Sequence, residues 1–212
     1  MNFTMSRSRF AAACFIAAFS VGLAGAAMAQ TQAVRVRGQI EKAEGDILTV
    51  KARDGAVLTI KLAENVRVMA FVKASLADIK PNSYIGVTSE PAGEGVEKAI
   101  AIHVFLETMR GTGEGQRAWD LRPGTNMTNA AVETTAGSVD GQMLTVKFKM
   151  GDRTGEQKVL VPPETPIVTY APASKDELKA GAQIIIFGAQ RQGDGTLVAP
   201  AVNVGRGVTP PM

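Results

Sequence analysis

The sequence SLADIKPNSYIGV at residues 75–87 returns later in the chain as SKDELKAGAQIII at residues 174–186. Ser75 can cap a helical turn, and Asp78 lies three residues further on, which is the pattern of a capping box. A segment of strand-forming apolar residues follows each turn. Two copies are too few for a solenoid, so the repeat predicts one small domain that has been duplicated.

Alternating, β-branched segments separated by turn residues surround the first copy. Asp54-Gly55 is a strong hairpin signal, because both residues tolerate positive φ. We expect three strands before the helical turn and two after it, at residues 34–40, 47–51, 57–62, 84–88 and 98–106. This is the element order of an OB-type five-stranded Greek-key barrel, and half of a β-sandwich is the alternative.

The same order of segments returns over residues 138–204, where LTVK at residues 144–147 repeats the LTVK of residues 48–51. The predicted fold is therefore all-β: two tandem five-stranded OB-like Greek-key barrels, each with a short helical turn between strands 3 and 4. We assign the first barrel to residues 34–107, a connecting segment to residues 108–132 and the second barrel to residues 133–205. Residues 206–212, which are rich in Gly and Pro, are expected to form a disordered tail.

The first 29 residues have the pattern of a secretory signal peptide. Arg7 and Arg9 precede an apolar run, and Ala27-Met28-Ala29 forms a small-x-small cleavage site before Gln30. A membrane anchor is the alternative, since the run is nearly long enough to span a bilayer. We expect cleavage, a periplasmic or secreted protein, and no membrane span afterwards.

The composition narrows the class of partner. The single cysteine, Cys14, lies in the predicted signal, so the exported chain would have no disulfide. Removing Arg7 and Arg9 lowers the formal net charge from +3 to +1, and the remaining Lys and Arg alternate with acids. Nucleic-acid-binding proteins usually carry a basic patch, so this pattern argues against a nucleic-acid partner.

These motifs resemble small exported bacterial OB-like β-barrel domains of uncharacterised function, which occur singly or in tandem behind signal peptides. The resemblance rests on the Leu-Thr-Val strands, the Ser-Leu-x-Asp helical turn and the Gly-containing turns, and covers about two thirds of the chain. It implies a role in stress response or in binding a small ligand or cation. Because the shared motifs are structural, the resemblance supplies no catalytic residue.

Residues 109–131, MRGTGEGQRAWDLRPGTNMTNAA, break the strand pattern and contain the only tryptophan. The segment is a flexible linker, a loop docked against a domain, or a ligand or partner contact. Trp and Arg are enriched where proteins make energetically important contacts. The candidate contact residues are Arg110, Glu114, Arg117, Trp119, Asp120 and Arg122.

Catalytic and metal-binding patterns are absent from the sequence. The only histidine, His103, falls on the predicted fifth strand, where we expect it at the surface or rim. Zinc sites need several Cys or His at set spacing, and a catalytic triad needs a motif serine beside the base. The sequence predicts no catalytic residue, no metal site and no cofactor, and hence no enzyme.

The favoured hypothesis is a periplasmic, non-enzymatic binding or interaction module. An unknown small ligand would bind between the barrels, where the connecting segment passes, because domain interfaces are common ligand sites. The alternative is a structural envelope protein that contacts only other proteins. A weaker third hypothesis is a periplasmic metal-binding protein, which would take up copper or calcium.

Overall fold

The computed structural model describes residues 33–138 and 140–211. These residues contain twelve strands and three short 3-10 turns. The all-β prediction is confirmed. The predicted signal peptide, residues 1–29, lies outside the described residues. Within them, no helix has the length and apolar character needed to cross a membrane.

The strands follow one another as hairpins joined by longer connections. They are β1 (Ala33–Glu44), β2 (Ile47–Ala52), β3 (Val57–Ala74), β4 (Tyr84–Gly93), β5 (Val96–Val104), β6 (Gly115–Ala118), β7 (Asn126–Ser138), β8 (Gly141–Met150), β9 (Arg153–Val161), β10 (Ile167–Pro172), β11 (Gln183–Arg191) and β12 (Leu197–Gly205). The 3-10 turns are η1 (Leu76–Asp78), η2 (Glu107–Met109) and η3 (Lys175–Glu177).

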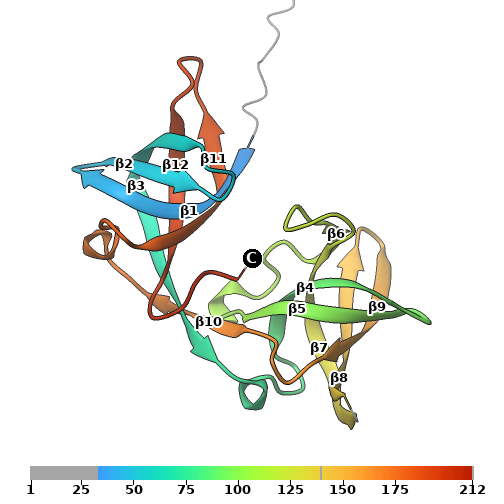
Figure 1. The fold of residues 1–212 in the computed structure, drawn as a ribbon. Helices are drawn as coiled ribbons and strands as arrows, with labels where there is room; N and C mark the ends of the chain where they lie inside the picture. Colours follow the sequence, from blue (N-terminus) through green and yellow to red (C-terminus); the bar gives the residue numbers. More distant parts are fainter. Residues whose placement is uncertain (1–32, 139, 212) are drawn as a thin grey trace, which may run out of the picture. The chain divides into compact units, whose positions relative to one another are not determined.

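Five strands close a barrel in the order β12-β11-β1-β2-β3, with β3 pairing in parallel with β12 to complete the ring (Figure 1). The predicted hairpin at Asp54-Gly55 joins β2 to β3, and Gly55 has a φ of 87°. Alternate residues of these strands point inward and form one buried cluster. It includes Ile40, Val50, Ile60, Ile186, Leu197 and Val202.

This barrel does not follow the domain boundaries expected from the sequence. Its strands β1 to β3 come from residues 34–107, but β11 and β12 come from residues 133–205. The strands left over, β4 and β5, pair with β7, β8 and β9, and β9 pairs in parallel with β5. These five strands enclose a second buried cluster, which includes Ile85, Ile102, Leu144, Val146 and Val159.

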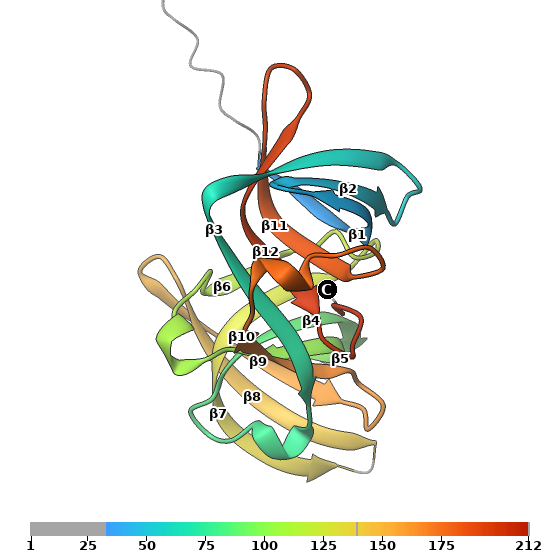
Figure 2. The same ribbon diagram turned by 90° about the vertical axis from the view of Figure 1, so that its left-hand side faces the viewer.

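The length of β3 explains why the chain leaves its first group of strands. Its 18 residues, at about 3.3 Å per residue, extend for about 60 Å, far beyond a typical strand. Its second half lies antiparallel to β10 (Figure 2). Phe71 is paired there with Tyr170, its counterpart in the other repeat. The chain therefore reaches η1 and β4 after it has left the barrel that β3 helps to close.

The two repeated helical turns form as the sequence predicts. The Ser75 backbone N–H and hydroxyl both donate to Asp78 Oδ2, each over 2.8 Å. Ile79, directly after η1, packs into the cluster of β4 and β5, while Leu178, after η3, packs into the β1–β3 barrel. Each turn thus covers the core of the strands that follow it.

Two segments expected to lack regular structure are folded. The connecting segment, residues 108–132, contains β6 and the first half of β7, which pairs with β4. Residues 206–211, expected to form a disordered tail, continue from β12 with the Arg206 N–H donating to the Phe71 carbonyl over 2.9 Å. Arg206 also pairs with Glu177 over 2.7 Å, and Pro210 is buried. The tail is held by contacts with β3 and η3 that local composition does not reveal.

Candidate functional site

A third buried cluster is aromatic and draws on both groups of strands and on the connecting segment. It contains Phe71, Tyr84, Ala101, Phe105, Trp119, Met127, Val168, Tyr170 and Ile185. His103 packs at its centre, with ring centroids 4.4 Å from Phe105 and 5.8 Å from Tyr170. The expectation that His103 lies at the surface or rim is wrong, since only 3% of it is exposed. The surrounding rings, supplied by distant strands, bury it.

A glycine makes room for the His103 ring. Gly86 on β4 is paired with His103 on one side and with Asn129 on the other. A Cβ at Gly86 would lie 2.0 Å from His103 Cε1 and 2.8 Å from Asn129 Oδ1. The two polar side chains therefore meet over the bare backbone of Gly86.

Trp119 lies between arginines from two parts of the chain. The Arg35 guanidinium, from β1, is 3.7 Å from the centre of the Trp119 ring, and that of Arg117, from β6, is 5.4 Å away. Cations stack favourably over aromatic faces, and Trp is the best such partner. Trp119 is 8% exposed, so the connecting segment docks through it.

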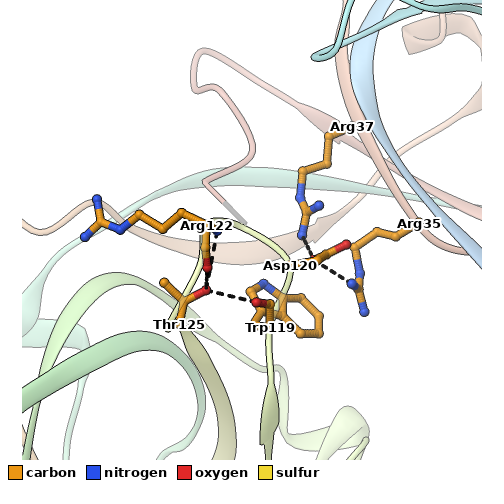
Figure 3. Close-up of polar contacts among 6 residues, drawn as sticks. All are labelled: Arg35, Arg37, Trp119, Asp120, Arg122 and Thr125. Carbon is orange, nitrogen blue, oxygen red and sulfur yellow. Dashed lines mark hydrogen bonds and ion pairs between the residues drawn. The ribbon is translucent and has the colours of Figure 1, made fainter.

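The turn after Trp119 holds Asp120 against β1 (Figure 3). The Thr125 hydroxyl donates to the carbonyls of Trp119 and Arg122, which closes the turn. Asp120 Oδ1 pairs with Arg35 over 2.6 Å and with Arg37 over 2.8 Å. Asp120 therefore anchors the segment through Oδ1, while its side chain stays 51% exposed.

The ionisation of Asp120 follows from these contacts. Burial alone would raise the pKa of the carboxyl, but hydrogen bonds from Arg37 and Arg35 outweigh it and lower the pKa to about 2. The carboxylate is ionised at neutral pH and neutralises part of the charge of the two arginines.

Arg117 has no ion-pair partner among residues 33–138 and 140–211. Its Nη1 donates to the Gly113 carbonyl over 2.9 Å. Burial and the neighbouring charge of Arg35 lower the pKa of the guanidinium, although arginine remains protonated in proteins. Arg117 is therefore an exposed, charged group without a carboxylate partner among the described residues.

These side chains line a cavity of about 260 Å³. Four of its buried polar atoms have no hydrogen-bond partner within the described residues: Arg35 Nε, His103 Nδ1, Asn129 Oδ1 and Trp119 Nε1. Asn129 uses its other amide atom, Nδ2, to donate to the Thr112 carbonyl over 2.9 Å. Burial, reinforced by the charge of Arg117, lowers the pKa of His103 to about 3, so the imidazole is neutral. The cavity lining is Arg35, His103, Thr112, Gly113, Arg117, Trp119, Met127, Asn129 and Phe187.

Three of the six candidate residues lie at or beside this cavity: Arg117, Trp119 and Asp120. The other three point elsewhere. Arg110 pairs with Glu107, and Glu114 accepts a hydrogen bond from the Lys149 N–H. Arg122 points away from Trp119 (Figure 3) and pairs with Glu90 over 2.6 Å.

Seven of the nine residues that line the cavity were not candidates from the sequence, among them Arg35, His103 and Asn129. A usable signal lies in the differences between the repeats. Gly86 and its strand partner His103 belong to the first repeat. The corresponding pair in the second repeat is Ile185 and Asn203. The first repeat thus has a glycine beside a histidine, where the second repeat has an isoleucine beside an asparagine. Such a difference between repeats indicates a specialised position.

Comparisons with protein-family models, curated proteins and solved structures found no significant match. Function is therefore inferred from the geometry of this chain. Within the described ranges, no group of three or more His, Cys, Asp or Glu side chains is placed to hold a metal ion.

A larger cavity, of about 730 Å³, has fewer unpaired polar atoms in its lining. It lies among β10, the loop before it and residues 208–211, and many of its lining residues are proline or aliphatic. Among its described lining atoms, Thr165 Oγ1 is the one buried polar side-chain atom without a partner. Its cations, Arg53 and Lys73, share the lining with Glu164. The smaller cavity has the denser set of unpaired polar groups and is the better candidate site.

Proposed function

We propose that this chain is an exported, non-enzymatic binding protein whose small-molecule site is the cavity beside Trp119. The observation that carries the proposal is the set of four unpartnered buried polar atoms, on Arg35, His103, Asn129 and Trp119, in the lining of one cavity. Leaving a buried polar group unpaired costs about 1–3 kcal/mol. A ligand that pairs with one or more of these atoms recovers part of that free energy, which is how a preformed site gains affinity.

The state of His103 favours binding over catalysis. General acid–base catalysis works best when the pKa of the group lies near the working pH. The pKa of His103 is lowered to about 3 by burial and by the charge of Arg117. The neutral imidazole is suited to accept or donate a hydrogen bond without exchanging its proton with a substrate.

The proposal extends to the fold: both groups of five strands are OB-like barrels that have exchanged strands between the two repeats. It is supported by the shared order of pairing, since β1-β2-β3-β12-β11 in one group corresponds to β7-β8-β9-β5-β4 in the other. In each group, a helical turn leads into the fourth strand of the repeat. The exchange of equivalent elements between duplicated units is the single-chain form of domain swapping.

Native mass spectrometry of the protein recovered from a bacterial periplasm tests the proposed function. We expect the folded ion to begin at Gln30 and to carry a reproducible small adduct. The adduct should be lost from an Arg117→Gln variant and kept by an Arg122→Gln variant, whose arginine pairs with Glu90 outside the cavity. A bare folded ion from every preparation would contradict small-molecule binding and favour a structural envelope protein that contacts other proteins. A retained signal would contradict export.

A further inference from the structure

We infer that the ligand of the cavity beside Trp119 is a small monocarboxylate with a flat apolar body. This inference rests on the proposed function and adds the chemical class of the ligand. It follows from the charge, the shape and the hydrogen-bonding groups of the cavity lining.

The positive charge of the cavity lining favours an anionic ligand. Among the nine described residues that line the cavity, two are arginines and none is an acid. Asp120, just outside, is already shared by Arg35 and Arg37. Arg35 is half-buried, and Arg117 is exposed, so its guanidinium lines the cavity while remaining accessible to a ligand. An anionic ligand beside Arg117 would supply the missing counter-charge.

The balance of charges favours one negative charge. Asp120 offsets part of the charge of Arg35 and Arg37, which leaves Arg117 as the cation without an ion-pair partner among the described residues. His103 adds no positive charge near neutral pH, because burial and Arg117 hold its pKa at about 3. A monocarboxylate matches this balance better than a phosphate monoester, which carries close to two charges.

The form of the donors also fits a carboxylate. A guanidinium presents parallel N–H groups that match the two oxygens of a carboxylate. Arg117 Nη2 and Asn129 Nδ2 both lie near Gly113, since a Cβ there would lie 3.5 Å from the first and 3.1 Å from the second; Asn129 Nδ2 already donates to the Thr112 carbonyl. The unpartnered Trp119 Nε1 supplies a further N–H in the same lining.

The rest of the lining is apolar and largely aromatic. Trp119, Phe187 and Met127 supply apolar surface, and the neutral His103 adds a flat ring. At about 260 Å³, the cavity lies just below the range of about 300–1,000 Å³ typical of pockets for drug-sized ligands. A nucleotide or an oligosaccharide is therefore too large, whereas a single ring bearing a carboxylate is of the right class.

Benzoate is the probe that tests this inference, with benzamide as its neutral isostere and inorganic phosphate as an anion without an apolar body. Trp119 is the only tryptophan of the chain and lines the cavity, so its fluorescence reports binding directly, and calorimetry on the exported full chain gives the affinity. We expect saturable binding of benzoate and at least tenfold weaker binding of benzamide and phosphate. Equal binding of benzamide, or tighter binding of phosphate, would overturn the assignment, as would the absence of benzoate binding.

Variants separate the charge of Arg117 from its structural role. Arg117→Gln should weaken benzoate binding by about tenfold to a hundredfold, the loss expected for a hydrogen-bonded charge. Arg117→Lys should recover part of the affinity because it keeps the charge without the fork, and Arg122→Gln should bind as the parent protein does. Unchanged affinity in Arg117→Gln would overturn the inference. A neutral adduct in the native mass spectrum, with no benzoate binding, would refute the carboxylate class and leave the proposed function standing.

Discussion

Replacing Gly86 with alanine is expected to destabilise the protein through the His103 ring. The new Cβ would lie 2.0 Å from His103 Cε1, 2.3 Å from His103 Nε2 and 2.8 Å from Asn129 Oδ1. His103 cannot swing aside, because Phe71, Phe105 and Tyr170 surround its ring. Overpacking a buried site costs about 1–3 kcal/mol, and the rigid surroundings here place the expected loss at about 2–3 kcal/mol.

Gly188→Ala is the matched control. Gly188 lies on β11, and a Cβ there would have no heavy atom within 4 Å. At such a site the substitution should be neutral or stabilising by about 0.4–1 kcal/mol, because alanine restricts the unfolded chain. The two variants should therefore differ by about 2–4 kcal/mol in free energy of unfolding.

Urea unfolding followed by Trp119 fluorescence measures this difference. For an m-value of about 2 kcal/mol/M, the midpoints of the two variants should lie about 1–2 M apart. Adding His103→Ala to Gly86→Ala should cost less than His103→Ala costs in the parent protein, because the clash partner is gone. Equal midpoints for the two glycine variants, or strictly additive losses in the double variant, would refute the role assigned to Gly86.

Three further predictions concern the same region and the strand exchange. Burial and Arg117 lower the pKa of His103 to about 3, so the unfolded chain, with a pKa of about 6.5, takes up the proton first as the pH falls. Below about pH 6.5, the free energy of unfolding should then drop by about 1.4 kcal/mol per pH unit. His103→Gln should remove this slope in urea unfolding between about pH 7 and pH 5. Trp119→Ala should cost about 3–5 kcal/mol by calorimetry, since Trp119 is 8% exposed and stacked on Arg35; a loss below about 1 kcal/mol would mean that the connecting segment is not docked. A chain cut after residue 107 lacks β11 and β12 and should not fold as a monomer, so a compact monomer in size-exclusion chromatography and circular dichroism would contradict the exchange of strands.

Local structure was accessible from the sequence. The hairpin at Asp54-Gly55 and the capped turn at Ser75 depend on contacts between residues close in the chain, and both form as expected. The alternation of apolar residues likewise predicted most of the strands. Trp119 and Arg117 could be singled out because a tryptophan and arginines are unusual in a Gly-rich segment.

The tertiary structure decided which strands close together. Both repeats offer strands of similar pattern, so periodicity does not distinguish pairing within a repeat from pairing between repeats. The 18-residue β3 determines the pairing, because the chain has left the barrel formed by β1, β2 and β3 before β4 begins. The burial of His103 and the contact of Arg35 with Asp120 follow from this long-range pairing, because the residues involved are distant in the sequence. Local sequence determined the strands and turns of this protein, whereas its cavity exists because distant strands pack against one another.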